Sequence, residues 1–237
     1  LGLRAARLLA AEALAEGIKV PGASIRIEKR IPMGGGLGGG SSDAATVLRG
    51  LNRLWGLGWA TERLAGLGLR LGADVPFFVA GRTALVRGIG EQLTPIELPE
   101  HHHVVLTPAV EIATAVVFKD PELTRDTIPL KIDSLSQVQA VFDAIAGGKN
   151  DLQAVVVKRS AAVAQALSLL AEAARSVGMA PEQARMSGSG ASVFLTVDGP
   201  GTAREVVRHL EGRIDGPTTY GPSRTGTDRL AGRLWIV

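Results

Sequence analysis

The sequence contains no cysteine among its 237 residues. A disulfide framework, a cysteine-ligated zinc finger and a thiol nucleophile are therefore excluded, and we expect a reducing cytoplasm as the compartment. Long apolar runs are missing as well. Charged residues such as Arg4, Arg7 and Glu12 interrupt the first apolar stretch, and no run approaches the roughly 18 to 20 residues that a membrane helix needs. We therefore expect no membrane segment.

Aromatic residues and charge of one sign are also scarce. Nine residues are aromatic, and 26 Lys and Arg against 23 Asp and Glu give a formal net charge of +3 that is scattered along the chain. Nucleic-acid binding usually needs a clustered basic surface with aromatic side chains that stack on bases. We therefore expect no nucleic-acid partner, whereas a weakly basic surface suits small phosphorylated substrates. The sequence leaves the oligomeric state open.

The hydrophobic spacing predicts a mixture of helices and strands. A chain with 46% hydrophobic residues can bury a core, and elements that do not alternate strictly indicate the α+β class. We place a domain boundary at the proline-bearing segment Thr94 to Pro99, which gives predicted domains 1–95 and 96–237. Predicted helices cover 3–15, 41–54, 61–69, 135–146, 152–174 and 203–211, and predicted strands cover 23–31, 83–87, 104–107 and 192–197.

A glycine-rich run follows the predicted strand Ala23 to Ile31. Pro32 stops the strand, six of the next eight residues are glycine, and Ser41 and Ser42 are suitable caps for the helix that follows. Glycine lets a ligand approach the backbone N–H groups closely, and a loop that opens a helix adds the positive end of the helix dipole. The order of strand, glycine loop and helix therefore predicts a phosphate-binding loop. A flexible linker is the alternative.

The type of phosphate loop is narrowed by what the run lacks. A Walker A loop needs Gly-Lys-Ser/Thr, but Gly40 is followed directly by Ser41, so a P-loop NTPase is unsupported. Gly34, Gly36 and Gly39 formally satisfy the dinucleotide-binding pattern G-x-G-x-x-G. Any glycine-dense run does the same, so a nicotinamide-dependent oxidoreductase is only a runner-up.

Five segments of the sequence resemble the GHMP kinases, a family of small-molecule kinases. Pro32-Met-Gly-Gly-Gly-Leu-Gly-Gly-Gly-Ser-Ser42 is similar to the family's ATP-binding motif, and Leu71-Gly-Ala-Asp-Val-Pro-Phe-Phe78 to the segment with its catalytic aspartate. The other three are 117–125, 150–152 and 186–191. The resemblance implies an α+β fold of two domains. The N-terminal ATP-binding domain would be ribosomal protein S5 domain 2-like, and the C-terminal substrate-binding domain would be ferredoxin-like.

The extended glycine form implies the branch of the family that acts on a cytidine diphosphate substrate. The implied reaction uses ATP and Mg²⁺ to phosphorylate the 2-hydroxyl of 4-(cytidine 5′-diphospho)-2-C-methyl-D-erythritol, in the non-mevalonate route to isoprenoid precursors. Asp74 would accept the hydroxyl proton. The implied ATP-binding residues are Lys29, Pro32, Met33, Gly34, Gly35, Gly36, Leu37, Gly38, Gly39, Gly40, Ser41 and Ser42, and the implied substrate-binding residues are Thr114, Phe118, Ser187 and Gly188.

Each of these assignments has a structural alternative. Asp74 could be a turn or cap residue, and Lys29 could be a solvated lysine on a strand. Phe118, which the resemblance places against the cytosine, could be a core aromatic. The segment Ser187 to Gly190 could be a tight turn that contacts no ligand. His101 and the two histidines after it point in alternate directions on an extended chain, so we expect a surface loop there and no metal site.

Other functions also stay open. The chain could be a different GHMP kinase, for example one that acts on mevalonate or homoserine. The family has a catalytic lysine and a glycine-tyrosine-histidine segment that we expect to precede Leu1. Because that lysine would stabilise charge on the transferred phosphoryl group, the chain could also bind a nucleotide without turnover.

Overall fold

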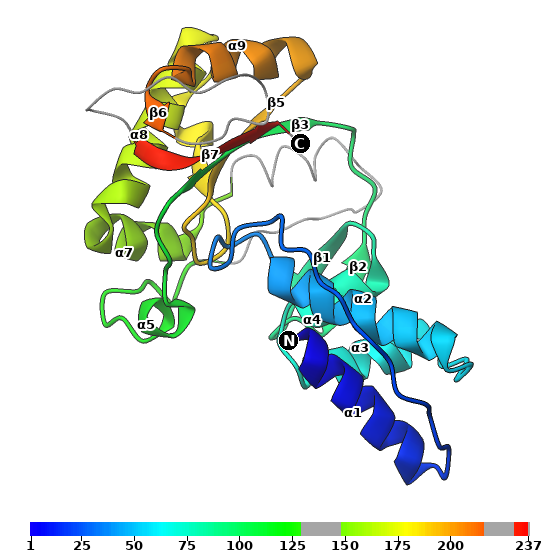
Figure 1. Cartoon of the computed structure of the whole chain (residues 1–237). Coiled ribbons are helices and arrows are strands. Elements are labelled where there is room, and N and C mark those ends of the chain that lie inside the picture. The colour runs from blue at the N-terminus through cyan, green and yellow to red at the C-terminus, as the bar shows by residue number, and fades with distance from the viewer. Residues whose placement is uncertain (129–147, 216–229, 237) are drawn as a thin grey trace. The chain divides into compact units, whose positions relative to one another are not determined.

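The computed structural model describes residues 1–128, 148–215 and, for the backbone, 230–236 (Figure 1). These residues form two compact units. Unit 1 comprises Leu1–Ile31 and Gly38–Leu98, and unit 2 comprises Pro32–Leu37 and Pro99–Val237. Both units contain helices and strands, so the α+β prediction is confirmed. The assignment of an ATP-binding and a substrate-binding role to the two predicted domains stays a prediction.

Unit 1 packs helices around a small apolar core and ends in a hairpin. Leu9, Leu48, Val75 and Val79 are among its buried side chains, and they come from three different helices. The helical spacing predicted at the N-terminus is therefore confirmed, since Leu9 lies on the buried face of the first helix. The elements are α1 (Gly2–Ala15), α2 (Gly39–Leu54), α3 (Thr61–Leu69), α4 (Val75–Ala80) and the antiparallel strands β1 (Ala84–Arg87) and β2 (Gln92–Pro95).

Two predictions for unit 1 are wrong. The segment Ala23–Ile31 is not a strand, because no strand in the described part of the chain pairs with its backbone, and its residues are exposed. Ser41 and Ser42 do not cap α2. The helix begins two residues earlier, at Gly39, because Gly38 has φ 68° and turns the chain into the helix without a side-chain cap.

Unit 2 is built on a five-stranded sheet with the order β4-β5-β3-β7-β6. All neighbouring strands are antiparallel except β6 and β7, which are parallel. Helices α8 and α9 pack against the sheet and against each other, and Leu106, Leu170 and Leu195 are fully buried between these layers. The strands are β3 (His102–Pro108), β4 (Arg185–Met186), β5 (Val193–Val197), β6 (Ile214–Asp215) and β7 (Leu230–Ile236), and the helices are α5 (Thr114–Phe118), α7 (Asp151–Arg159), α8 (Ala161–Ser176), η1 (Pro181–Gln183) and α9 (Pro200–Leu210).

The predicted continuous helix 152–174 is interrupted at Ser160. This residue has an extended backbone, with φ −132° and ψ 103°, and its side chain accepts a hydrogen bond from the Val163 N–H as the cap of α8. Serine competes for backbone donors in this way, which apolar periodicity alone does not reveal. Helices α7 and α8 therefore meet at 119°. The predicted helix 135–146 lies outside the described residues.

The expected surface loop at the three histidines is also wrong. His102 and His103 open β3, and the His103 Nδ1 lies 3.0 Å from the Thr196 hydroxyl on the adjacent strand. Burial lowers the pKa of His103, and the neighbouring His101 and His102 add to this effect. The two histidines lie in the sheet because the same strand continues into Val104 and Leu106, which are buried in the core.

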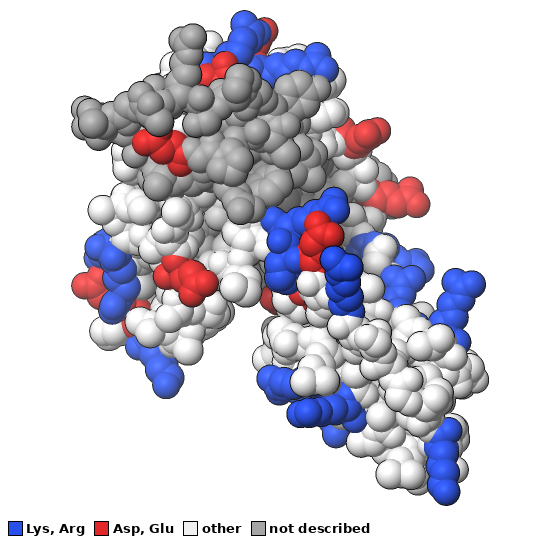
Figure 2. Space-filling model, viewed as in Figure 1, with Lys and Arg blue, Asp and Glu red and all other residues white. Residues whose placement is uncertain are grey.

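For the described residues alone, the charged side chains and the apolar helices bear on two expectations from the sequence. On the face drawn in Figure 2, basic side chains are scattered over both the upper and the lower part of the view, and acidic ones are visible mainly in the upper and middle parts. Among the described residues, no single helix is long and apolar enough to cross a membrane, although the bent pair α7 and α8 together meets the requirement of length and composition. The expectation that the chain binds no nucleic acid stays a prediction.

Candidate active site

The first half of the glycine run is bound to a second glycine loop within unit 2. The Ser187 hydroxyl donates to the Gly36 carbonyl at 2.8 Å. The N–H groups of Ala191 and Ser192 donate to the carbonyls of Gly34 and Gly35 at 3.2 and 3.0 Å. The segments 34–36 and 187–192 therefore form one interlocked pair of loops, although about 150 residues of sequence separate them.

Glycine is required at position 36 of this interlock. Gly36 has φ 70°, in the left-handed region that other residues rarely adopt. A Cβ there would lie 2.8 Å from the Gly190 carbonyl oxygen and closer still to that of Ser187. Because both atoms belong to the backbone, they cannot rotate away.

The second half of the run opens helix α2 in unit 1. Gly38 has φ 68°, and a Cβ there would lie 2.6 Å from a ring carbon of Phe78, so the aromatic ring packs directly on the loop backbone. The 16-residue helix starts at Gly39 and places the hydroxyls of Ser41 and Ser42 in its first turn. This end of the helix carries unpaired N–H groups and the positive end of the dipole, which favour an anion such as phosphate.

Lys29 is held at this helix end. Its Nζ lies 2.5 Å from the Asp43 carboxylate in the first turns of α2, and a Cβ on Gly39 would be 3.7 Å from the same nitrogen. The two side chains are 34% and 28% exposed. Lys29 is therefore not the fully solvated lysine that the alternative described. Its ammonium group lies beside the predicted phosphate loop.

Asp74 precedes helix α4 and is exposed. It occupies the cap position, but its side chain makes no capping hydrogen bond, which speaks against the structural-cap alternative. Phe78 lies four residues further along, on the same face of the helix, and its ring packs on Gly38. The fold of unit 1 therefore directs this face of α4 towards the second half of the glycine run. The role of Asp74 as a base stays a prediction.

The residues predicted to bind substrate come together in unit 2. Phe118, Ser187 and Gly188 line a pocket of about 670 Å³. Thr114 does not line it, but its hydroxyl lies 2.8 Å from that of Ser189 and so joins α5 to the same loop. Phe118 is 52% exposed, which does not fit a core aromatic. The segment 187–190 is a tight turn as well as a pocket wall, since the Gly190 N–H donates to the Ser187 carbonyl.

The same pocket is lined by charged groups that the sequence reading did not select. The lining contains three basic residues and one acidic residue, so its charge favours an anionic ligand. These residues are Arg125, Lys149 and Arg185, and Asp151. Burial lowers the pKa of Arg185 from its ordinary value, but an arginine remains charged at neutral pH. The segment 117–125 resembled the family as a whole, and no local periodicity singled out Arg125 within it.

Asn150 also has a structural role in the site that the sequence did not predict. Its side-chain amide donates to the carbonyls of Met186 and Gly188, both at 2.8 Å. Its Oδ1 accepts from the Leu152 N–H and caps α7. One side chain therefore fixes both the helix start and the pocket loop. The capping signal Asn-Asp-Leu could have located the helix start, but not the contact with the distant loop.

Known proteins resemble this chain over most of its length. Residues 3–82 match the family described as GHMP kinases N terminal domain. A 4-diphosphocytidyl-2-C-methyl-D-erythritol kinase of Nitrosomonas europaea is 45% identical over 224 residues, which cover 94% of this chain and 75% of the relative.

Solved structures show the same relationship. A crystal structure of 4-(cytidine 5′-diphospho)-2C-methyl-D-erythritol kinase matches with a TM-score of 0.65 and 33% identity over 87% of this chain and 73% of that chain. A homoserine kinase from Cytophaga hutchinsonii matches with a TM-score of 0.58 at 17% identity, over 86% of this chain and 69% of that one. At that identity, the second match shows the fold alone.

Proposed function

Because the chain belongs to the 4-diphosphocytidyl-2-C-methyl-D-erythritol kinase family of the GHMP kinases, we propose that it phosphorylates 4-(cytidine 5′-diphospho)-2-C-methyl-D-erythritol with ATP. The observation that carries the proposal is the 45% identity to a relative of that name over 94% of the chain. The cationic pocket beside Phe118 supports it, because a cytidine diphosphate offers an aromatic base and two phosphates.

In the proposed reaction the 2-hydroxyl oxygen of the substrate attacks the γ-phosphorus of ATP. The bond between that phosphorus and the β,γ-bridging oxygen breaks, ADP leaves, and the hydroxyl proton passes to the Asp74 carboxylate. The loop from Pro32 to Ser42 and the N-terminus of α2 would hold the ATP phosphates. The Lys29 ammonium at this helix end would add positive charge near them.

Magnesium fits this site as an ion that accompanies ATP. Among the described residues no group of three or more His, Cys, Asp or Glu side chains could hold a metal ion. Mg²⁺ needs no such cage, because it is commonly held by substrate phosphates, water and one or two protein oxygens. The hydroxyls of Ser41 and Ser42 in the first turn of α2 are the groups that would reach it. When bound, the ion would neutralise charge on the phosphates.

The proposed base is tested by Asp74→Asn. A positioned base typically contributes about 10²- to 10⁴-fold, so kcat should fall by at least about 100-fold while binding of a non-hydrolysable ATP analogue is unchanged. Glu62→Gln is the matched control, since Glu62 is an exposed acid at the start of α3 in the same unit. ADP release is measured by a coupled assay. Near-normal turnover of Asp74→Asn would remove the carboxylate from the chemistry.

The substrate is tested in the same assay with a panel of alcohols. Turnover should be highest with the cytidine diphosphate substrate and should be absent or weak with mevalonate and homoserine. A preference for either of those alcohols would overturn the substrate assignment and leave the kinase assignment intact. Calorimetry with the ATP analogue separates a chain that binds nucleotide without turnover from one that binds none.

A further inference from the structure

The turn after helix α5 is closed by the side chain of Arg125. Its Nη2 donates to the Phe118 carbonyl at 2.7 Å and to the Asp120 carbonyl at 3.3 Å. The Phe118 carbonyl is among the last of the helix, where the backbone acceptors have no partner within the helix. A guanidinium there satisfies two acceptors and complements the negative end of the dipole. Arg125 therefore fixes the backbone of the residue whose ring lines the pocket.

The same turn is tied to helix α7 through Asp120. The Asp120 side chain is 5% exposed and accepts a hydrogen bond from the Glu122 N–H at 2.9 Å and one from the Arg159 Nε at 2.5 Å. Arg159 is the last residue of α7. A second ion pair, Lys158 with Glu122, joins the same elements but is more than 60% exposed on both sides. The buried carboxylate is therefore the firm point of attachment, and the exposed pair adds little.

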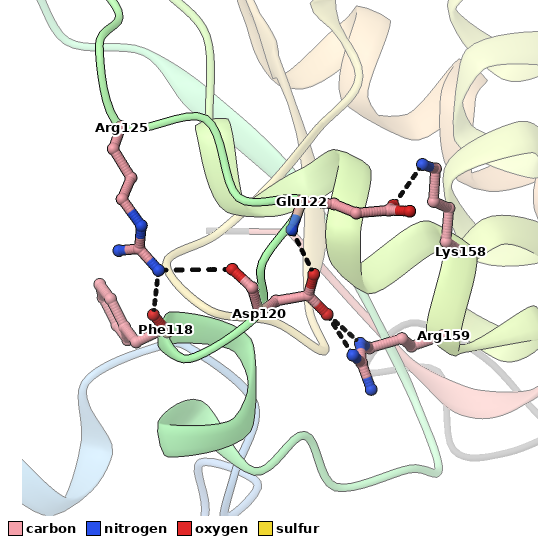
Figure 3. A network of polar contacts seen from close by, with 6 residues as sticks. All are labelled: Phe118, Asp120, Glu122, Arg125, Lys158 and Arg159. Carbon is pink, nitrogen blue, oxygen red and sulfur yellow. Dashed lines mark hydrogen bonds and ion pairs between the residues drawn. The ribbon is translucent and has the colours of Figure 1, made fainter.

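We propose that Arg125, together with the Asp120–Arg159 pair, positions the Phe118 ring for an aromatic base of a nucleoside diphosphate. We call these three side chains, Arg125, Asp120 and Arg159, the clamp. Figure 3 shows the Phe118 ring pointing away from Asp120 and Arg159, and the hydrogen bond that links the clamp to Phe118 runs from Arg125 to the Phe118 carbonyl. It acts through the backbone. Arg125 also lines the pocket, and its test must therefore separate positioning from direct contact.

The position of the Phe118 ring depends on the contacts that hold the end of helix α5. Phe118 is half exposed, and its anchored neighbour is Val117, which is 2% exposed. A helix of five residues has little rigidity of its own, so the ring direction depends on what holds the helix end. Fixing that end before the ligand arrives lowers the ordering cost of binding. The proposal rests on the proposed function, in which Phe118 stacks on the cytosine.

The test is a double-mutant cycle on CDP binding, measured by calorimetry. Phe118→Leu removes the aromatic face, and Arg125→Met removes the guanidinium fork while keeping much of the side-chain length. If the clamp acts through the ring, Arg125→Met should weaken CDP binding on the order of 10-fold in the wild-type background and should have almost no effect in the Phe118→Leu background. A contact between Arg125 and the diphosphate would instead give the same loss in both backgrounds.

Two further variants separate the clamp from general destabilisation. Arg159→Met breaks the Asp120 attachment without touching the pocket, so it should also weaken CDP binding and lose its effect in the Phe118→Leu background. Lys158→Met is the matched control from the same helix end, and it should leave CDP binding unchanged. Binding of a non-hydrolysable ATP analogue should be unaffected in all of them.

The outcomes are distinct for the two proposals. Wild-type CDP affinity in both Arg125→Met and Arg159→Met, or losses that add fully to that of Phe118→Leu, would overturn the clamp and leave the proposed function standing. Unchanged CDP binding in Phe118→Leu would remove the stacking role that the proposed function assigns to this ring, and the clamp would fall with it. Coupled losses with unchanged ATP-analogue binding would establish the clamp.

Discussion

Replacing Gly36 by alanine should break the interlock between the two glycine loops. The alanine would have to adopt the φ of 70°, which lies in the left-handed region. Its Cβ would lie 2.8 Å from the Gly190 carbonyl oxygen. Since neighbouring backbone atoms cannot move aside singly, the segments 34–36 and 187–192 must separate. Separation weakens the hydrogen bonds from Ser187, Ala191 and Ser192 to the carbonyls of 34–36.

The magnitude follows from these two contributions. A non-glycine residue at left-handed φ costs about 1 to 2 kcal/mol. Three weakened hydrogen bonds cost about 0.5 to 1.5 kcal/mol each. The free energy of unfolding should therefore fall by about 2.5 to 6.5 kcal/mol in total. Gly178→Ala is the matched control, because Gly178 has φ 76° and a Cβ there would meet nothing within 4 Å. Gly178→Ala should therefore lose only the free energy that a non-glycine residue loses at left-handed φ.

The assay is urea unfolding followed by circular dichroism, together with binding of a non-hydrolysable ATP analogue. Gly36→Ala should lose at least about 1.5 kcal/mol more than Gly178→Ala, since the gain from a less flexible unfolded chain is the same in both. It should also weaken ATP-analogue binding, which Gly178→Ala should not. Equal destabilisation by the two variants would refute the argument from the interlock.

Lys29→Met removes the ion pair with Asp43, which is partly exposed and should cost under about 1 kcal/mol of stability, while ATP-analogue affinity measured by calorimetry should fall several-fold. Unchanged affinity would exclude Lys29 from the phosphate site. The pKa of Asp120 lies below its ordinary value, first because of the Glu122 N–H hydrogen bond and then because of Arg159. The stabilisation is therefore complete above the unfolded pKa of about 4 and is lost as the pH falls through the lower folded value. The gap between wild type and Asp120→Asn in urea midpoint should accordingly close below about pH 4, and a constant gap would contradict the linkage.

Local patterns predicted much of the fold. The spacing of Leu9 and its neighbours located α1, and the glycine run before Ala44 located the start of α2 to within two residues. These features depend on residues a few positions apart, which is the range over which periodicity and capping act. The strand β2 was missed because Gln92–Pro95 is only four residues long and ends in proline, a residue that usually argues against a strand.

Long-range features of the candidate site were beyond such patterns. The bond between Ser187 and Gly36 and the contacts of Asn150 with Met186 join segments that only the folded chain brings together. The segment Ala23–Ile31 is the opposite case, because a local pattern predicted a strand that the fold does not form. Its alternation is real, but a strand also needs a partner backbone, and the described residues supply none.

The division of the glycine run between two units has a consequence for protein engineering. The chain leaves unit 1 at Pro32, returns to it at Gly38, and leaves it again at Pro99. A fragment that begins at Pro99 would therefore lack Pro32–Leu37, and with it the carbonyls of Gly34, Gly35 and Gly36 that accept the hydrogen bonds of the 187–192 loop. Unit 2 therefore cannot be transferred to another protein as one continuous segment of sequence. A chimera between kinases of this family would need to exchange Pro32–Leu37 together with everything after residue 98.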